Sequence, residues 1–348
     1  MITYKEYFLF NEGGAGGHMQ HPFDVDSVNS GQDLITFFDR AYDSLANQPG
    51  SLKIDGVNAS IKFIGQEFAL DRGSNKPIDV EGITIARLGE RFPEGHGMIK
   101  VGTEVLSFFN NALGNIKEEL QSLGLLENPN ILFNLEYVDG STNVLEYDEK
   151  FIAIHGLLEM YQATPRRRAS KEVNYNPEVM KTLIEKLNAS GDIKVFGSVD
   201  VGVGEKPNYE AVLSQNVEIP YEQSSNEVKP LKQWLQELKL PKRVKLKRLD
   251  GTPREAISKA NYMDIILQQV PVDTLYEDPN QQKAAIDGAI VYHATRFLGK
   301  ALLETLDSPM GRVDSHEGVV IRDPRIDERP VKITGDFIIQ GLQSTFRK

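Results

Sequence analysis

Strand-type patterns are confined to two separated parts of this 348-residue chain. Apolar and polar residues alternate over 57–63 and 131–138, and a neighbouring apolar run covers 151–158. Such alternation is typical of half-buried strands. The pattern returns only at 317–321 and 331–340. The simplest arrangement places both sets of strands in one domain, made from the first and last parts of the chain.

Helical patterns lie around and between these strands. Apolar residues at i, i+3, i+4 and i+7 predict one helix starting near Ser30 and another over 106–120. Asn176-Pro177 has the form of a helix start. Further helices are predicted around 228–239, 254–269 and 282–306.

The order of these elements predicts an α+β fold. We expect one domain of antiparallel sheets built from residues 1–160 and 311–348. A mainly helical insertion, residues 161–310, would interrupt it. The length is consistent with two domains or with one large domain carrying an insertion.

Composition narrows the class of protein. Hydrophobic residues make up 40% of the chain, enough for an ordinary core. There is no cysteine, which excludes disulfides and cysteine-based zinc sites. No apolar run is long enough to cross a membrane and no secretory signal is visible, so we expect a cytoplasmic protein with no membrane partner. The net charge of −11 weighs against a dedicated non-specific nucleic-acid binder.

One ordered set of charged residues stands out. Lys53-Ile54-Asp55-Gly56 enters the first predicted strand, and alone this Lys-x-Asp-Gly motif is weak. It is followed by Arg72, by Glu136 in FNLEY, by Glu317 in EGVVI and by Lys332 in VKIT. The last four residues lie on or beside predicted strands. The order Lys, Arg, Glu, Glu, Lys is far more specific than any single member.

This set resembles the covalent nucleotidyltransferase superfamily of ATP-dependent DNA ligases, RNA ligases and mRNA-capping enzymes. Its motif I resembles KIDG, motif III resembles FNLEY, motif IIIa resembles FIAIHGLL, motif IV resembles EGVVI and motif V resembles VKIT. The resemblance covers about half of the chain. It implies an ATP-grasp-like nucleotidyltransferase domain of antiparallel sheets.

The resemblance also implies a reaction. Lys53 would attack the α-phosphorus of ATP and become covalently attached to AMP, which is then transferred to a 5′-phosphate end and lost on joining to a 3′-hydroxyl. An amine attacks only when deprotonated, so the lysine needs partial desolvation or nearby cations. The cofactors would be ATP and Mg²⁺, with Mn²⁺ as a substitute, and the partners would be polynucleotide ends.

Roles for the other residues follow from the resemblance. Lys332 would contact the α-phosphate, and Arg72 the ribose or the acceptor phosphate. Glu136 and Glu317 would bind the ribose hydroxyls or Mg²⁺, because hard cations prefer carboxylate oxygens. The neighbours of the lysine are expected at the nucleotide as well: Leu52, Asp55 and Gly56.

Two departures from the family matter. Motif V commonly has a second lysine, where this chain has Thr334. Lys76, Arg322 or the insertion could supply the missing cation. Sixteen residues follow Lys332, which leaves no room for the C-terminal OB-fold domain of DNA ligases and capping enzymes. RNA-ligase-like members manage without that domain, so RNA is favoured over DNA as the substrate.

Two further features remain open. The loop Gly13–Gly17, with His18 and His21, could approach a phosphate or form half of a metal site, or be an ordinary glycine-rich turn. It loosely resembles phage-encoded members of the superfamily, which would place the protein in a host cytoplasm. Basic clusters in the predicted insertion could contact nucleic acid or be solvated surface. They are Arg166-Arg167-Arg168 and, within the segment 242–248, Lys242, Arg243, Lys245, Lys247 and Arg248.

The leading prediction is therefore an ATP-dependent polynucleotide ligase. A capping-type guanylyltransferase is the alternative within catalysis. A third possibility is a nucleic-acid-binding or virion-associated protein whose nucleotidyltransferase site has decayed. The intact Lys53, Glu136, Glu317 and Lys332 argue against decay, and Thr334 keeps that alternative open.

Overall fold

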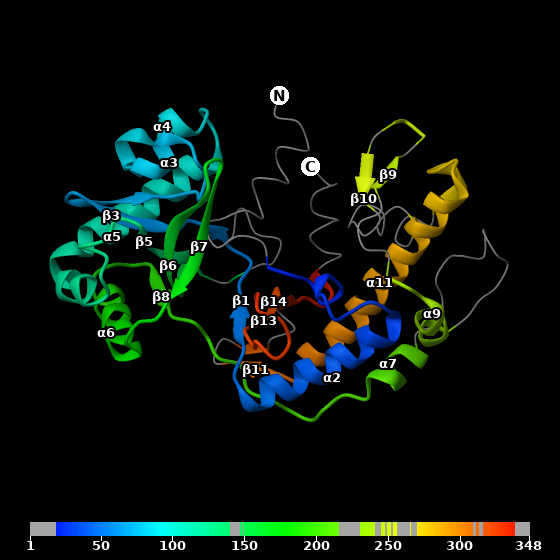
Figure 1. Ribbon diagram of the computed structural model, residues 1–348. Helices are drawn as coiled ribbons and strands as arrows, with labels where there is room; N and C mark the ends of the chain where they lie inside the picture. The colour runs from blue at the N-terminus through cyan, green and yellow to red at the C-terminus, as the bar shows by residue number, and fades with distance from the viewer. Residues whose placement is uncertain are drawn as a thin grey trace. The chain divides into compact units, whose positions relative to one another are not determined.

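The computed structural model describes two compact units (Figure 1). The chain passes from one unit to the other between Lys53 and Ile54, and again between Ser198 and Val199. Both helices and mainly antiparallel sheets are present, so the α+β class is confirmed. The described residues are 19–139, 147, 149–215, 230–240, 245–247, 249–251, 253–255, 265, 270–308, 311–312 and 316–337.

The first unit, within residues 54–198, is built on one seven-stranded sheet. Every strand pair in it is antiparallel except β6 with β8, which is parallel. The main strand order is β4 (Glu67–Leu70), β3 (Ile61–Ile64), β5 (Ile131–Val138), β6 (Phe151–Thr164) and β7 (Arg167–Val173), with β2 (Val57–Asn58) on β5 and β8 (Lys194–Phe196) on β6.

One face of this sheet buries the core of the first unit. Phe109 of the long helix α5 (Gly97–Ser122) packs its ring 5.8 Å from that of Phe133 on β5 and 5.3 Å from that of Phe68 on β4. All three side chains are fully buried, and such burial is the main stabilising term for a fold of this size. The remaining helices of the unit are α3 (Pro77–Glu81), η2 (Ile85–Arg87), α4 (Leu88–Arg91) and α6 (Pro177–Asn188).

The second unit contains a three-stranded antiparallel sheet made from the two ends of its sequence. Its order is β1 (Ser51–Lys53), β13 (Gly318–Ile321) and β14 (Val331–Ile333). Two short two-stranded ladders join β9 (Lys245–Lys247) with β10 (Pro253–Glu255), and β11 (Asp307–Ser308) with β12 (Gly311–Arg312).

Helices α2 (Gly31–Asn47) and α11 (Pro279–Leu303) contact one another beside this sheet (Figure 1). The start of α2 is fixed by Ser30, whose hydroxyl accepts from the Asp33 N–H at 3.1 Å while the Asp33 carboxylate accepts from the Ser30 N–H at 3.0 Å. This reciprocal capping explains why the helix begins where the sequence predicts. The other helices are η1 (Pro22–Asp24), α7 (Tyr209–Gln215), α9 (Leu231–Glu237) and η4 (Val272–Thr274).

Most predicted elements are confirmed. The strand over 131–138 has those bounds in the structure, and the helices predicted from Ser30, over 106–120 and from Asn176 are α2, α5 and α6. The predicted strand 57–63 is divided into β2 and β3 by Ala59 and Ser60. Most of the predicted helix 254–269 lies outside the described residues, and its first two positions belong to β10.

The unit boundaries differ from the predicted domain boundaries. The predicted start of the insertion, residue 161, lies inside β6, whose partner β7 continues the same sheet. The helix α6 and the strand β8 also belong to the first unit. The predicted second boundary, residue 311, lies inside the second unit, where β1 and β13 pair across most of the chain length. Long-range strand pairing of this kind leaves no local signal in the sequence.

In the described part of the chain, no helix combines the length and the apolar character needed to span a membrane.

Candidate functional site

The sheet β1-β13-β14 brings together three of the predicted site residues. Lys53 ends β1, Glu317 directly precedes β13, and Lys332 is the central residue of β14. The Lys53 Nζ lies 2.5 Å from Glu317 Oε2, although the two residues are 264 positions apart in the chain. Both side chains are about one-tenth exposed, so this ion pair is largely shielded from water.

The strand register puts both lysines on one face of this sheet. Ser51 pairs with Val320, and Val320 pairs with Lys332, so these three share a face. Lys53 is two residues after Ser51 and therefore points to the same side. Leu52 points to the opposite side, is 2% exposed, and donates its N–H to the Val199 carbonyl at 2.8 Å. The structure therefore places the Leu52 side chain away from Lys53.

A glycine lies between Lys53 and β14. Gly318 pairs with Lys53 and has a φ of +146°, a conformation that favours glycine. A Cβ at this position would lie 1.9 Å from the Ile333 carbonyl oxygen. The absence of a side chain at Gly318 lets β14 approach, and this brings the backbone of Thr334 to the same end of the sheet as Lys53.

Arg322 extends the cationic character of this sheet face. It follows β13 and lies two residues after Val320, and its Nη1 donates to Ser51 Oγ at 2.6 Å. Arg322 is one of the residues that could replace the missing second lysine of motif V. This hydrogen bond places it beside β1. Lys76 belongs to the first unit, where it precedes α3.

The other predicted nucleotide contacts lie in the first unit, on the sheet face opposite α5. Glu136 on β5 pairs with Asn58 on β2, and its Oε2 lies 3.3 Å from His155 Nε2. Asn134, on the same face, accepts from the Asn58 amide at 3.4 Å. His155 sits where the β5–β6 register shifts, between the pairs Asn134–Gly156 and Leu135–Ile154. This bulge turns the histidine toward Glu136.

Asp55 and Gly56 are held close to this polar face. A Cβ on Gly56 would come within 2.9 Å of the Glu136 Cβ, so the backbone of Gly56 packs directly on the glutamate. The Asp55 N–H donates to the Tyr147 hydroxyl at 3.1 Å. Residues 55, 56 and 136, which the motif order placed together, therefore do lie together in this unit.

Arg72 lies next to a buried ionic network. Its Nη1 donates to the Asn58 carbonyl, and burial lowers the pKa of its guanidinium. The preceding Asp71 is fully buried and accepts two hydrogen bonds from Arg168, at 2.9 and 2.8 Å, and one from Lys62 at 2.9 Å. Burial opposes ionisation of Asp71, but these cations outweigh it and hold the pKa of the carboxyl below its usual value.

Sequence reasoning missed two of these residues. His155 was included only as part of a strand, although Gly156, with a φ of +131°, is the kind of residue that marks a bulge. The sequence does not distinguish Arg168 from its neighbours Arg166 and Arg167. Its burial depends on Asp71, which is 97 residues away. No local pattern reveals such a pair.

Gly13–Gly17, His18, Lys242, Arg243 and Arg248 lie outside the described residues. Lys245 and Lys247 form part of β9, and Lys247 is exposed. His21 precedes η1 and stacks on Phe23 with ring centroids 5.1 Å apart.

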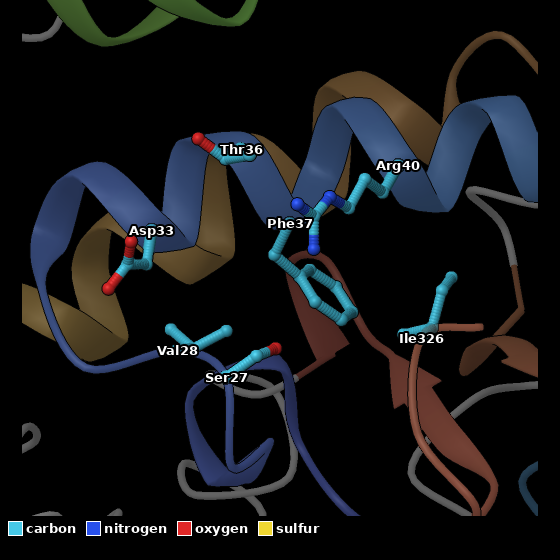
Figure 2. Close-up of a pocket in the computed structure, with 7 residues that line it drawn as sticks. All are labelled: Ser27, Val28, Asp33, Thr36, Phe37, Arg40 and Ile326. Carbon is cyan, nitrogen blue, oxygen red and sulfur yellow. The ribbon is translucent and has the colours of Figure 1, made fainter. Parts of the chain in front are cut away.

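A small pocket of about 180 Å³ opens on the second unit (Figure 2). It is lined by α2 residues such as Asp33, Phe37 and Arg40, together with Ile326. No predicted site residue lines it, and it is smaller than the ~300–1,000 Å³ usual for small-molecule sites. Asp33 is already engaged as the capping partner of Ser30. The pocket therefore suggests no function.

Comparison of the chain with protein-family models, with curated proteins and with solved structures found no match.

Proposed function

We propose that this protein is an ATP-dependent polynucleotide ligase with an ATP-grasp-like nucleotidyltransferase core, and that Lys53 is the residue that becomes adenylated. The observation that carries the proposal is the Lys53–Glu317 ion pair on the sheet β1-β13-β14. The resemblance implies that the residues of motifs I, IV and V act together. In this sheet β1 meets two segments from near the other end of the sequence, which bring together a lysine, a glutamate and a second lysine.

The chemistry of this residue set fits a triphosphate. Two lysines on one shielded sheet face, with Arg322 beside them, supply positive charge for the α-phosphate and for the leaving pyrophosphate. In the proposed step, Lys53 Nζ forms a bond to the α-phosphorus and the bond to pyrophosphate breaks. The amine must lose a proton first, and the Glu317 carboxylate lies within hydrogen-bonding distance to accept it.

Mg²⁺ would be held partly by the nucleotide itself. In the described part of the chain, no three His, Cys, Asp or Glu side chains gather as a metal site. At nucleotide sites Mg²⁺ commonly takes one or two protein carboxylates and completes its shell with phosphates and water. Glu317 is the carboxylate of the second unit that fits this role, and the bound ion would supply charge neutralisation at the phosphates.

The Glu317→Gln variant tests the role of that carboxylate. We expect self-adenylation to slow by about 100-fold or more, because the glutamine can neither accept a proton nor bind a cation strongly. The measurement is the rate of AMP incorporation across an Mg²⁺ titration. Glu328→Gln, an exposed carboxylate in the same unit, is the matched control. Unchanged rate and unchanged Mg²⁺ dependence in Glu317→Gln would refute the assignment of motif IV.

The Glu136→Ala variant tests the ribose contact that the resemblance assigns. We expect the apparent KM for ATP to rise by about tenfold or more with a smaller loss of kcat, since a ground-state contact of about 1.5–3 kcal/mol is removed. The measurement is the rate of adenylation as a function of ATP concentration. His155→Asn, which leaves Glu136 in place, serves as a comparison. An unchanged KM for ATP in Glu136→Ala would remove this residue from the nucleotide site.

The alternative within catalysis is a capping-type guanylyltransferase, which would form the same lysyl bond with GMP. Incubation with labelled ATP and, separately, labelled GTP distinguishes the two, and we expect incorporation from ATP. A joining assay with nicked and single-stranded RNA and DNA then identifies the polynucleotide, with RNA as the expected substrate.

A further inference from the structure

The hairpin of β6 and β7 forms the last strand pair on the main path of the sheet in the first unit (Figure 1). Residues 161–167, which cover the end of β6, the turn and the start of β7, are all exposed. Tyr161 is 46% exposed, one of the larger exposed hydrophobic side chains of the described chain. The pairing of β6 with β5 ends at Glu159, so the end of the hairpin is a two-stranded extension of the sheet that carries an exposed aromatic residue.

The turn of this hairpin is fixed by its own side chains. The Gln162 amide donates to the carbonyls of Thr164 and Arg167. The Arg166 N–H in turn lies 3.4 Å from Thr164 Oγ1. The same Gln162 amide lies 3.5 Å from the Asn75 side-chain oxygen, so the hairpin end also touches the loop that follows Arg72.

The three consecutive arginines of the hairpin have different environments. Arg168 is buried and is committed to Asp71 through two hydrogen bonds. Arg166 and Arg167 are exposed, and within the described residues neither forms an ion pair. The buried arginine anchors the hairpin to the core, while the other two present their charges to solvent.

We propose that the β6–β7 hairpin end is a binding surface for single-stranded nucleic acid. Arg166 and Arg167 would pair with backbone phosphates, and Tyr161 would stack on a base. Two exposed cations on a chain of net charge −11 form a local surface that complements phosphate. Combining such cations with an exposed aromatic ring is the usual way in which single strands are held without sequence preference. The inference goes beyond the proposed function, because binding can be measured whether or not Lys53 is adenylated.

The test is fluorescence anisotropy with a fluorescein-labelled, mixed-sequence, single-stranded RNA over a salt series. For Arg166→Ala/Arg167→Ala we expect about tenfold weaker binding near 0.1 M salt. The slope of log K against log salt should fall by about 1.4, because each phosphate contact to a single strand contributes about 0.7. Tyr161→Ala should weaken binding by about fivefold or more without changing the slope. Arg166→Lys/Arg167→Lys should restore the slope.

The matched control is Lys117→Ala/Lys181→Ala, which removes two exposed charges from α5 and α6 of the same unit. Equal weakening in this control, or unchanged binding in the arginine variant, would overturn the proposal. The proposal would also be overturned if the arginine variant lost binding to labelled poly-glutamate and kept its binding to the RNA. That result would indicate an acidic protein partner. A thermal melt of each variant verifies folding. Self-adenylation is measured in parallel, so that failure of the proposed enzyme activity is recorded separately from failure of RNA binding.

Discussion

Replacing Lys53 with alanine is expected to abolish the covalent AMP adduct altogether. No other described lysine combines a Lys-x-Asp-Gly motif with a hydrogen-bonded carboxylate on a shared sheet. Removing the only nucleophile of a covalent mechanism leaves no alternative path to the adduct. The measurement is incorporation of label from α-labelled ATP after denaturing electrophoresis.

Lys53→Arg is the more informative companion variant. Alanine removes the Lys53 ion pair from the shielded Glu317 carboxylate, and such a loss can itself destabilise a protein. Arginine keeps the positive charge and the ion pair but stays protonated and cannot attack phosphorus. We expect Lys53→Arg to melt like the wild type and to form no adduct. Adduct formation at the wild-type level in either variant would exclude Lys53 as the nucleophile.

Gly318→Ala is expected to destabilise the second unit by about 2–5 kcal/mol. Of this, about 1–2 kcal/mol comes from placing a side chain at a φ of +146°. Another ~1–3 kcal/mol comes from overpacking, because the new Cβ would lie 1.9 Å from the Ile333 carbonyl oxygen. Since β13 links β1 to β14, we also expect adenylation to fall steeply. Thermal denaturation and AMP incorporation measure the two effects.

The control for this variant is Gly251→Ala in the same unit. Gly251 also has a positive φ, +79°, but among the described residues no heavy atom lies within 4 Å of a Cβ placed there. It should therefore show the conformational cost alone and normal adenylation. If Gly318→Ala is no less stable than Gly251→Ala, the close approach of β13 and β14 is not as described.

Local patterns in the sequence were sufficient for most of the secondary structure. The helix after Ser30 carries both its periodic apolar face and its capping residues, and the strand 131–138 alternates over its full length. The division of the chain could not be predicted in the same way. The boundary between Lys53 and Ile54 falls within the Lys-x-Asp-Gly motif, and the ion pair between Lys53 of β1 and Glu317, just before β13, joins residues 264 positions apart.

In the candidate site too, local motifs identified individual residues, and long-range contacts decided how they lie together. Motif order identified Lys53, Glu317 and Lys332, and the strand register then placed the two lysines on one face. The His155–Glu136 contact joins the neighbouring strands β5 and β6, and the burial of Arg168 requires Asp71. Both are tertiary effects that residue type and spacing do not encode.

The most direct test of the central claim is to identify the residue that carries AMP. The wild-type protein is incubated with ATP and Mg²⁺, digested under conditions that preserve phosphoramides, and analysed by peptide mass spectrometry. We expect AMP on the peptide containing Lys53, with release on acid treatment and restoration of ATP when pyrophosphate is added. An adduct on any other residue, or no adduct with either ATP or GTP, would contradict the account.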